Sequence, residues 1–176
     1  IESGDSPYAK SGSCNVDVVC SEGNNYRSQI NAMARYSFGA WLCSGQLMNN
    51  TAQDKRALFS TANHCLSSQA NASSVVVYWK YESPTCRTPG SESSGTSIPV
   101  EGNSIAQTGG STLLATYQPA DTTLLELNTP VPVAANPFWL GWDRSLDVPA
   151  SAVGIHHPQG HEKRISFENG PLASSE

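Results

Sequence analysis

The chain has 176 residues, which is enough for one domain of ordinary size or two small ones. Ten Lys and Arg against fifteen Asp and Glu give a formal net charge of −5, and no basic block occurs. Nucleic acid is therefore not expected as a partner, because its binding depends on clustered Lys and Arg. No run of 18 apolar residues is present, so we expect a soluble chain with no membrane partner.

The composition predicts an all-β protein. Hydrophobic residues make up 38% and charged residues 14%, while 14 Gly and 11 Pro recur at short intervals. This pattern is typical of short strands joined by tight turns. In chain order, we expect an N-terminal arm over residues 1–13, an irregular connection over 83–111, a Pro-rich linker over 130–137, and strands at 36–48, 56–61, 75–79, 111–117, 124–127, 138–142 and 152–156.

The five cysteines indicate disulfides. They occur at Cys14, Cys20, Cys43, Cys65 and Cys86, with no C-x-x-C pair of the kind that structural zinc sites use. Disulfides form in oxidising compartments, so the pattern favours a secreted protein. Because the number is odd, one cysteine stays free or pairs outside the chain.

His64 lies in the sharpest local motif, the stretch Ser60 to Cys65 (STANHC). An imidazole next to a disulfide has a fixed backbone, which is what a general base beside a nucleophilic serine requires. The alternative is a surface histidine that only neighbours a structural cysteine.

Asp121 begins the apolar stretch DTTLLEL. We expect its carboxylate to be buried against the His64 ring, where an acid would hold the imidazole tautomer. The alternative is an ordinary aspartate that caps a turn.

The two motifs together resemble those of trypsin-fold serine proteases, and further stretches are similar to bacterial lysyl endopeptidases. T-A-x-H-C is followed about 57 residues later by D-x-x-L-L-x-L, and the likeness runs from about residue 11 to the end. The additional matching stretches are SGSCNVDVVC (11–20), GQLMNNTA (45–52), VVYW (76–79), GWDR (141–144) and IHHP (155–158) through EKRIS (162–166).

The resemblance implies a double antiparallel β-barrel, with the first barrel complete over residues 14–136 and the second only partly present over 137–176. His64 would be the general base and Asp121 its orienting acid. The reaction would be hydrolysis of polypeptides after lysine through an acyl-enzyme, without a cofactor. The implied disulfides are Cys43–Cys65 and Cys20–Cys86. Cys14 would bond to a C-terminal piece of the same protein, in a second barrel beyond this chain.

The chain resembles the amino-terminal part of such an enzyme, because no serine after Asp121 lies in the Gly-x-Ser-Gly context of the family nucleophile. The serines without flanking glycines are Ser145, Ser151, Ser166, Ser174 and Ser175. The nucleophile and the specificity pocket would lie outside the chain. The sequence therefore does not decide whether the enzyme prefers to cut after lysine or after arginine. The 176 residues alone are therefore expected to be inactive, and the alternative function is a truncated or nicked fragment or binding module.

Two other features lie in the N-terminal arm. The motif Gly4–Pro7 mimics a nucleophile loop, but it precedes His64, in the wrong chain order. Lys10 lies where the family resemblance begins, so a lysine-specific enzyme would be able to trim the arm there.

The cluster of His156, His157 and His161 offers zinc ligands. His156 and His157 are adjacent, however, and would point to opposite faces of a strand. We therefore expect no metal. The family resemblance implies that this segment lies in the second barrel near the cleft and shapes the substrate side, and the alternative is a hydrogen-bonded structural pair.

Overall fold

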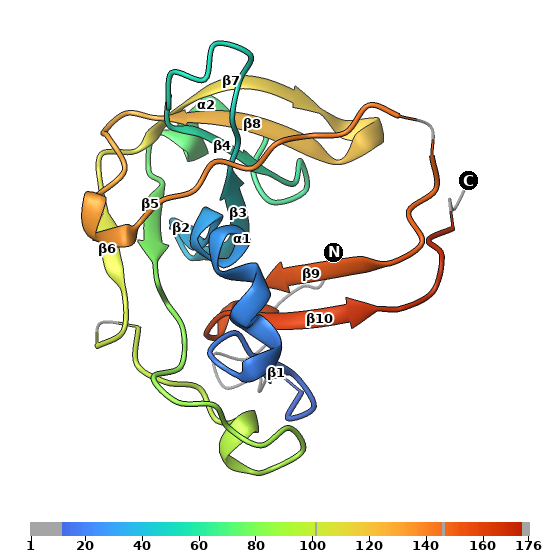
Figure 1. Cartoon of the computed structure of the whole chain (residues 1–176). Coiled ribbons are helices and arrows are strands. Elements are labelled where there is room, and N and C mark those ends of the chain that lie inside the picture. Colours follow the sequence, from blue (N-terminus) through green and yellow to red (C-terminus); the bar gives the residue numbers. More distant parts are fainter. Residues whose placement is uncertain (1–11, 101, 146, 174–176) are drawn as a thin grey trace.

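The computed structural model describes residues 12–100, 102–145 and 147–173, which form two antiparallel sheets (Figure 1). One sheet has seven strands in the order β6-β5-β2-β3-β4-β8-β7, and the other has three in the order β1-β10-β9. The all-β class is confirmed. The strand pairs found within the described ranges do not close either sheet into a barrel.

Strands dominate, and the helices are short. The strands are β1 Val16–Asp17, β2 Met33–Phe38, β3 Trp41–Leu47, β4 Leu58–Thr61, β5 Val76–Trp79, β6 Ile105–Gln107, β7 Ser111–Tyr117, β8 Thr122–Leu127, β9 Ala152–His156 and β10 Arg164–Glu168. The helices are η1 Ser21–Tyr26, α1 Arg27–Ala32, α2 Gln69–Ala72, η2 Ser93–Gly95, η3 Gln118–Ala120, η4 Val133–Ala135 and η5 Pro158–Gly160. In the part of the chain that the structure describes, no helix is long and apolar enough to span a bilayer.

The single strand expected over 36–48 is instead a hairpin. β2 ends at Phe38 and β3 begins at Trp41, with Phe38 and Trp41 paired across the turn. Gly39 has φ +55°, a backbone conformation that favours glycine, so the chain reverses there. The two Asn residues at 49–50 therefore follow the second strand of a pair.

The prediction of a strand over 138–142 is wrong. Only Leu140 pairs there, through an isolated parallel bridge to Met48. Phe138 and Trp142 are 40% and 51% exposed, so their apolar character does not reflect a buried strand.

The seven-stranded sheet has its own hydrophobic core. Tyr36, Phe59 and Trp79 are almost fully buried, and Phe59 makes edge-to-face contacts with both other rings at centroid distances of 5.6 and 6.1 Å. Such contacts add to the gain from burial. Leu47 of β3 and Leu125 of β8 also belong to this core, so the central strands are tightly packed.

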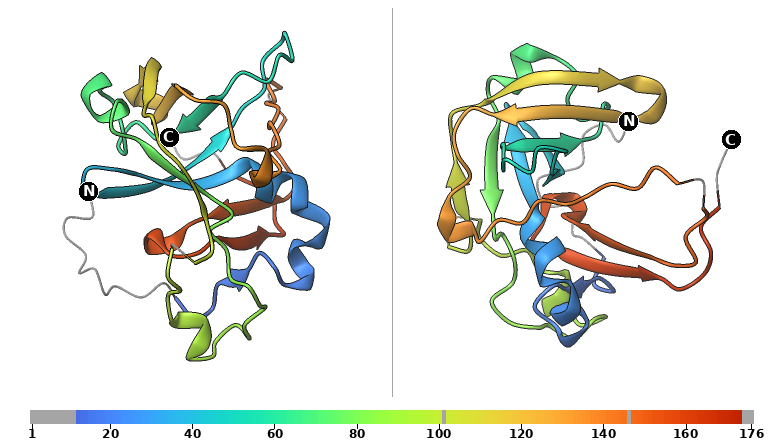
Figure 2. Two further views of the ribbon diagram at one scale, coloured as in Figure 1. Left: turned by 90° about the vertical axis from the view of Figure 1, so that its left-hand side faces the viewer. Right: turned by 45° about the horizontal axis from the view of Figure 1, so that its top comes forward.

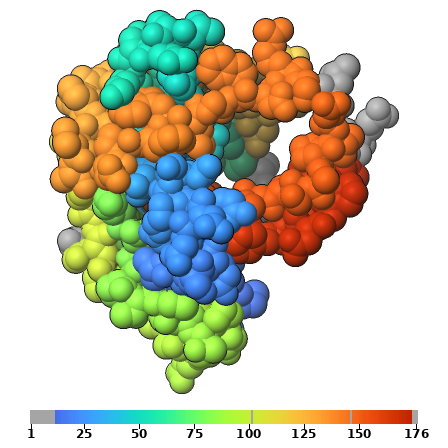
Figure 3. Space-filling view, viewed as in Figure 1, coloured from blue at the N-terminus to red at the C-terminus, as the bar shows by residue number. Residues whose placement is uncertain are grey.

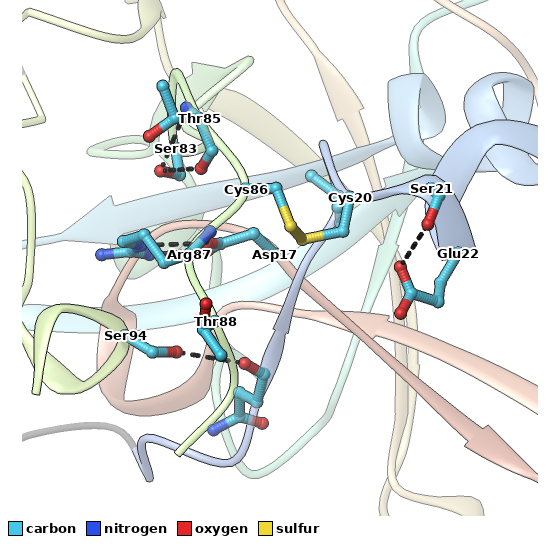
Figure 4. The surroundings of a disulfide bond; sticks show 12 residues. Asp17, Cys20, Ser21, Glu22, Ser83, Thr85, Cys86, Arg87, Thr88 and Ser94 are labelled. Carbon is cyan, nitrogen blue, oxygen red and sulfur yellow. Dashed lines mark hydrogen bonds and ion pairs between the residues drawn. A yellow bond between two sulfur atoms is a disulfide. The ribbon is translucent and has the colours of Figure 1, made fainter. Parts of the chain in front are cut away.

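The three-stranded sheet has a smaller core, formed by Val18, Ile30 and Ile165. A buried ion cluster lies beside it, in which Arg87 and Arg164 contact Asp17 and Glu162. Figure 4 shows Asp17 and Arg87 next to the Cys20–Cys86 disulfide. The cluster joins β1, β10 and the connection that follows β5.

The two sheets lie at an angle to each other, as the views in Figure 2 show. In the space-filling view of Figure 3, the orange and red stretch that contains β9 and β10 encloses an open gap beside the rest of the chain. The faces of β9 and β10 near Val153 and Phe167 are exposed, at 37% and 39%.

Candidate active site

His64 and Asp121 are brought together by the pairing of β4 with β8. Thr61, at the end of β4, is the register partner of Thr123 in β8. His64 follows Thr61 by three residues and Asp121 precedes Thr123 by two. The sheet therefore places two residues that are 57 apart in the sequence at the same edge.

The two residues make a double contact. The Nδ1 atom of His64 lies 2.6 Å from Oδ2 of Asp121, and the backbone N–H of His64 donates to Oδ1 at 2.8 Å. These hydrogen bonds, the backbone one above all, lower the pKa of Asp121, so the carboxylate is charged at neutral pH. A neutral imidazole that donates through Nδ1–H keeps Nε2 free as a proton acceptor.

The carboxylate is not buried as expected. The side chains of Asp121 and His64 are 52% and 72% exposed. Asp121 ends the turn η3 in the left-handed conformation, with φ 45° and ψ 44°. This conformation puts the side chain at the tip of the β7–β8 hairpin rather than under the sheet, and Asp and Asn tolerate it better than most residues.

A disulfide holds the chain next to His64. Cys65 is bonded to Cys43 in β3, and the following residue, Leu66, is 1% exposed. The second implied bridge, Cys20–Cys86, is also present, and Cys14 is free and exposed. The backbone of the histidine segment is thus tied to a central strand on one side and to the core on the other.

His157 and His161 are not part of the His64–Asp121 pair and have structural contacts instead. His157 is 6% exposed and its ring stacks on that of Tyr81. Burial lowers the pKa of His157 well below its usual value, so the imidazole is neutral at pH 7. Its Nδ1 contacts the carbonyl of His161, and its backbone N–H donates to Ser44. The segment therefore connects the β9–β10 turn to β3. Across residues 12–100, 102–145 and 147–173, no group of three potential ligands is placed to hold a metal ion.

In the part of the chain that the structure describes, no serine is hydrogen-bonded to His64. Ser145 donates to Asp143, and Ser166 lies against the carbonyl of Gly154. Within the described ranges, no hydrogen bond to Nε2 of His64 is found. The motif Gly4–Pro7, Lys10, Ser174 and Ser175 lie outside the described residues.

Three polar residues beside the pair were missed in the sequence. Asn63, Thr116 and Thr123 form a hydrogen-bonded chain next to His64. The only signal for Asn63 was its place in the variable position of T-A-x-H-C, and the threonines have no signal without the hairpin register.

The chain is similar to known proteins of one family. The family model described as lysyl endopeptidase, C-terminal domain, matches residues 8–176. A lysyl endopeptidase from Pseudomonas aeruginosa is 33% identical over 173 residues, which is 92% of this chain and 35% of that protein. The chain thus spans about a third of the length of that relative. The prediction that the chain corresponds to the amino-terminal part of such an enzyme is wrong, because the matching family model describes the C-terminal domain. The chain belongs to the lysyl endopeptidase C-terminal domain family.

Proposed function

We propose that this chain supplies the general base and its orienting acid to a serine endopeptidase that cuts on the carboxyl side of lysine. The double contact between His64 and Asp121 supports the assignment, because it fixes the ring and leaves Nε2 available. The preference for lysine rests on the family to which the chain belongs.

In the proposed reaction, Nε2 of His64 takes the proton of a serine hydroxyl while the oxygen attacks the substrate carbonyl. The Asp121 carboxylate stabilises the imidazolium that forms. His64 then gives the proton to the leaving amine, which departs and leaves an acyl-enzyme. A water molecule, deprotonated by the same nitrogen, releases the peptide acid and restores the serine.

The nucleophile and the oxyanion hole are proposed to come from polypeptide outside these 176 residues. Polypeptides are the proposed substrates, and another part of the same protein is a proposed partner, with the exposed Cys14 as the proposed point of attachment. We propose that the protein is secreted because it has two disulfides, which persist in oxidising compartments.

The test uses the longest natural form of the protein that contains this chain. Hydrolysis of nitroanilides with lysine or arginine before the scissile bond is measured for the wild type, His64→Ala and Asp121→Asn. We expect losses in kcat of about 10⁶-fold and about 10⁴-fold, because removal of triad members has these effects in other serine proteases.

Thr112→Val is the matched control, since Thr112 lies in the same hairpin but bonds to Asn128. A wild type that is neither active nor labelled by a serine-directed phosphonate would overturn the proposal in favour of an inactive binding module. Activity retained in His64→Ala would also overturn it.

A further inference from the structure

A chain of three hydrogen bonds connects the histidine segment to the β7–β8 hairpin. Nδ2 of Asn63 donates to Oγ1 of Thr116 at 2.6 Å. The hydroxyls of Thr116 and Thr123 lie 2.8 Å apart, and Thr123 donates to the carbonyl of Leu66 at 2.7 Å. The path begins one residue before His64 and ends two residues after it.

The hydrogen bonds in this path all run in one direction, from donor to acceptor. A hydroxyl has a single hydrogen, and that of Thr123 is used on the carbonyl of Leu66. Thr116 must therefore donate to Thr123, and its oxygen accepts from Asn63. Each hydroxyl donates its single hydrogen once, so the orientations of Thr116 and Thr123 are fixed by their partners.

The path joins the two sides of the candidate active site. Thr116 and Thr123 are register partners in the hairpin stem, one rung below the pair Tyr117 and Thr122. Asp121 lies at the tip of this hairpin, after the short turn η3. The stem is thus bonded to the histidine segment independently of the carboxylate.

We infer that Asn63, Thr116 and Thr123 are positioning residues that hold the hairpin so that both carboxylate oxygens of Asp121 reach His64 at once. This inference rests on the proposed function for its catalytic meaning. Thr123 is fully buried, which makes the inner end of the path rigid, while Thr116 and Asn63 reach outward to the solvent-facing pair.

The need for such a device follows from the exposure of the pair. Water has access to Asp121 and His64, which are 52% and 72% exposed, and competes for their hydrogen bonds. The left-handed backbone of Asp121 also needs support from its surroundings. A displacement of about 1 Å in a catalytic group can cost about 100-fold in rate.

The test compares Thr116→Val with Thr116→Ser in the 176-residue chain, with Thr112→Val as the control. Valine removes the hydroxyl but favours strands, and residue 116 is exposed, so the hairpin is expected to form. Serine keeps the hydroxyl. NMR reports the low-field proton on Nδ1 of His64 and the titration of the Asp121 carboxyl carbon.

In Thr116→Val we expect the pKa of Asp121 to rise towards its usual value and the Nδ1 proton signal to broaden by at least about threefold, with both restored in Thr116→Ser. Unchanged signals in Thr116→Val would overturn the inference. Equal changes in Thr112→Val would also overturn it, because they would reflect the hairpin in general.

Activity of the longer protein separates this inference from the proposed function. We expect kcat to fall about 10- to 100-fold in Thr116→Val, with KM unchanged and recovery in Thr116→Ser. The NMR readouts need no nucleophile, so they decide the positioning role even if the His64→Ala variant shows that the proposed function is wrong.

Discussion

The substitution Asp17→Asn tests how the three-stranded sheet is held to the connection that follows β5. Asp17 is fully buried and accepts hydrogen bonds from the backbone N, Nε and Nη2 of Arg87, at 3.0, 2.9 and 2.6 Å. The Nη1 atom of Arg164 lies 3.1 Å away. Hydrogen bonds to Asp17 raise the pKa of Arg87. A guanidinium keeps its proton in proteins in any case, so Arg87 stays charged when the carboxylate is removed.

The expected cost is large because an asparagine places a neutral amide, with donors of its own, against two buried cations. Removing one partner of a buried ion pair costs about 3–5 kcal/mol. Glu162 remains as the other anion, since it contacts both Arg87 and Arg164. Typical domains have only about 5–15 kcal/mol of stability. We therefore expect a loss of about 3 kcal/mol, enough to endanger the packing of the smaller sheet.

Urea denaturation followed by tryptophan fluorescence and circular dichroism measures this loss. The matched control is Glu126→Gln, which breaks the bidentate pair with Arg56 on the surface. Solvent screens that pair, so its loss is expected to be much smaller. A loss below about 1 kcal/mol in Asp17→Asn, or one equal to that of Glu126→Gln, would refute the reasoning.

Two further predictions follow from buried contacts. Burial lowers the pKa of Lys163, whose Nζ donates to the carbonyl of Ile30, to about 8. Because the folded pKa is below the unfolded one, stability should rise between about pH 8 and 10, by up to about 3 kcal/mol, and urea denaturation of Lys163→Met should lack this rise. A Cβ at Gly45 would lie 2.2 Å from Cε1 of Phe59, whereas one at Gly141 would meet nothing within 4 Å. Gly45→Ala should therefore cost about 1–3 kcal/mol in the same assay and Gly141→Ala much less, and equal losses would contradict this account.

The strands that were predictable are those that a local pattern specifies. Residues 75–79 are rich in branched and aromatic side chains, and residues 111–117 follow a Gly-Gly turn, so β5 and β7 form close to the expected bounds. β10 gave no such signal. Its first residues, Arg164 and Ile165, are both buried, and the charge of the arginine is paired there with Asp17 and Glu162. The sequence does not show that such a charge has partners, because they are distant along the chain. An arginine of this kind is therefore predicted to lie on the surface.

The contact between His64 and Asp121 was predictable from the sequence, but its environment was not. The motif around His64 and the aspartate before an apolar strand identify the two groups, and the pairing of β4 with β8 brings them together. The expected burial of Asp121 did not follow, because the backbone conformation at a hairpin tip decides where the carboxylate points. The hydrogen-bonded path through Thr116 depends on cross-strand register, which single motifs do not report.

The location of the pair has a consequence for its robustness. Both residues adjoin strands of the seven-stranded sheet, β4 and β8, which has its own core and the disulfide Cys43–Cys65. Strand pairing does not join this sheet to β9 and β10 in the described residues, although His157 bonds to Ser44 of β3. The three-stranded sheet relies on a small core and on the ion cluster around Asp17. Loss of that cluster should therefore loosen β9 and β10 first, and leave the contact between His64 and Asp121 in place. Hydrogen exchange in Asp17→Asn should show faster exchange in β10 than in β4 and β8, because local opening follows local stability.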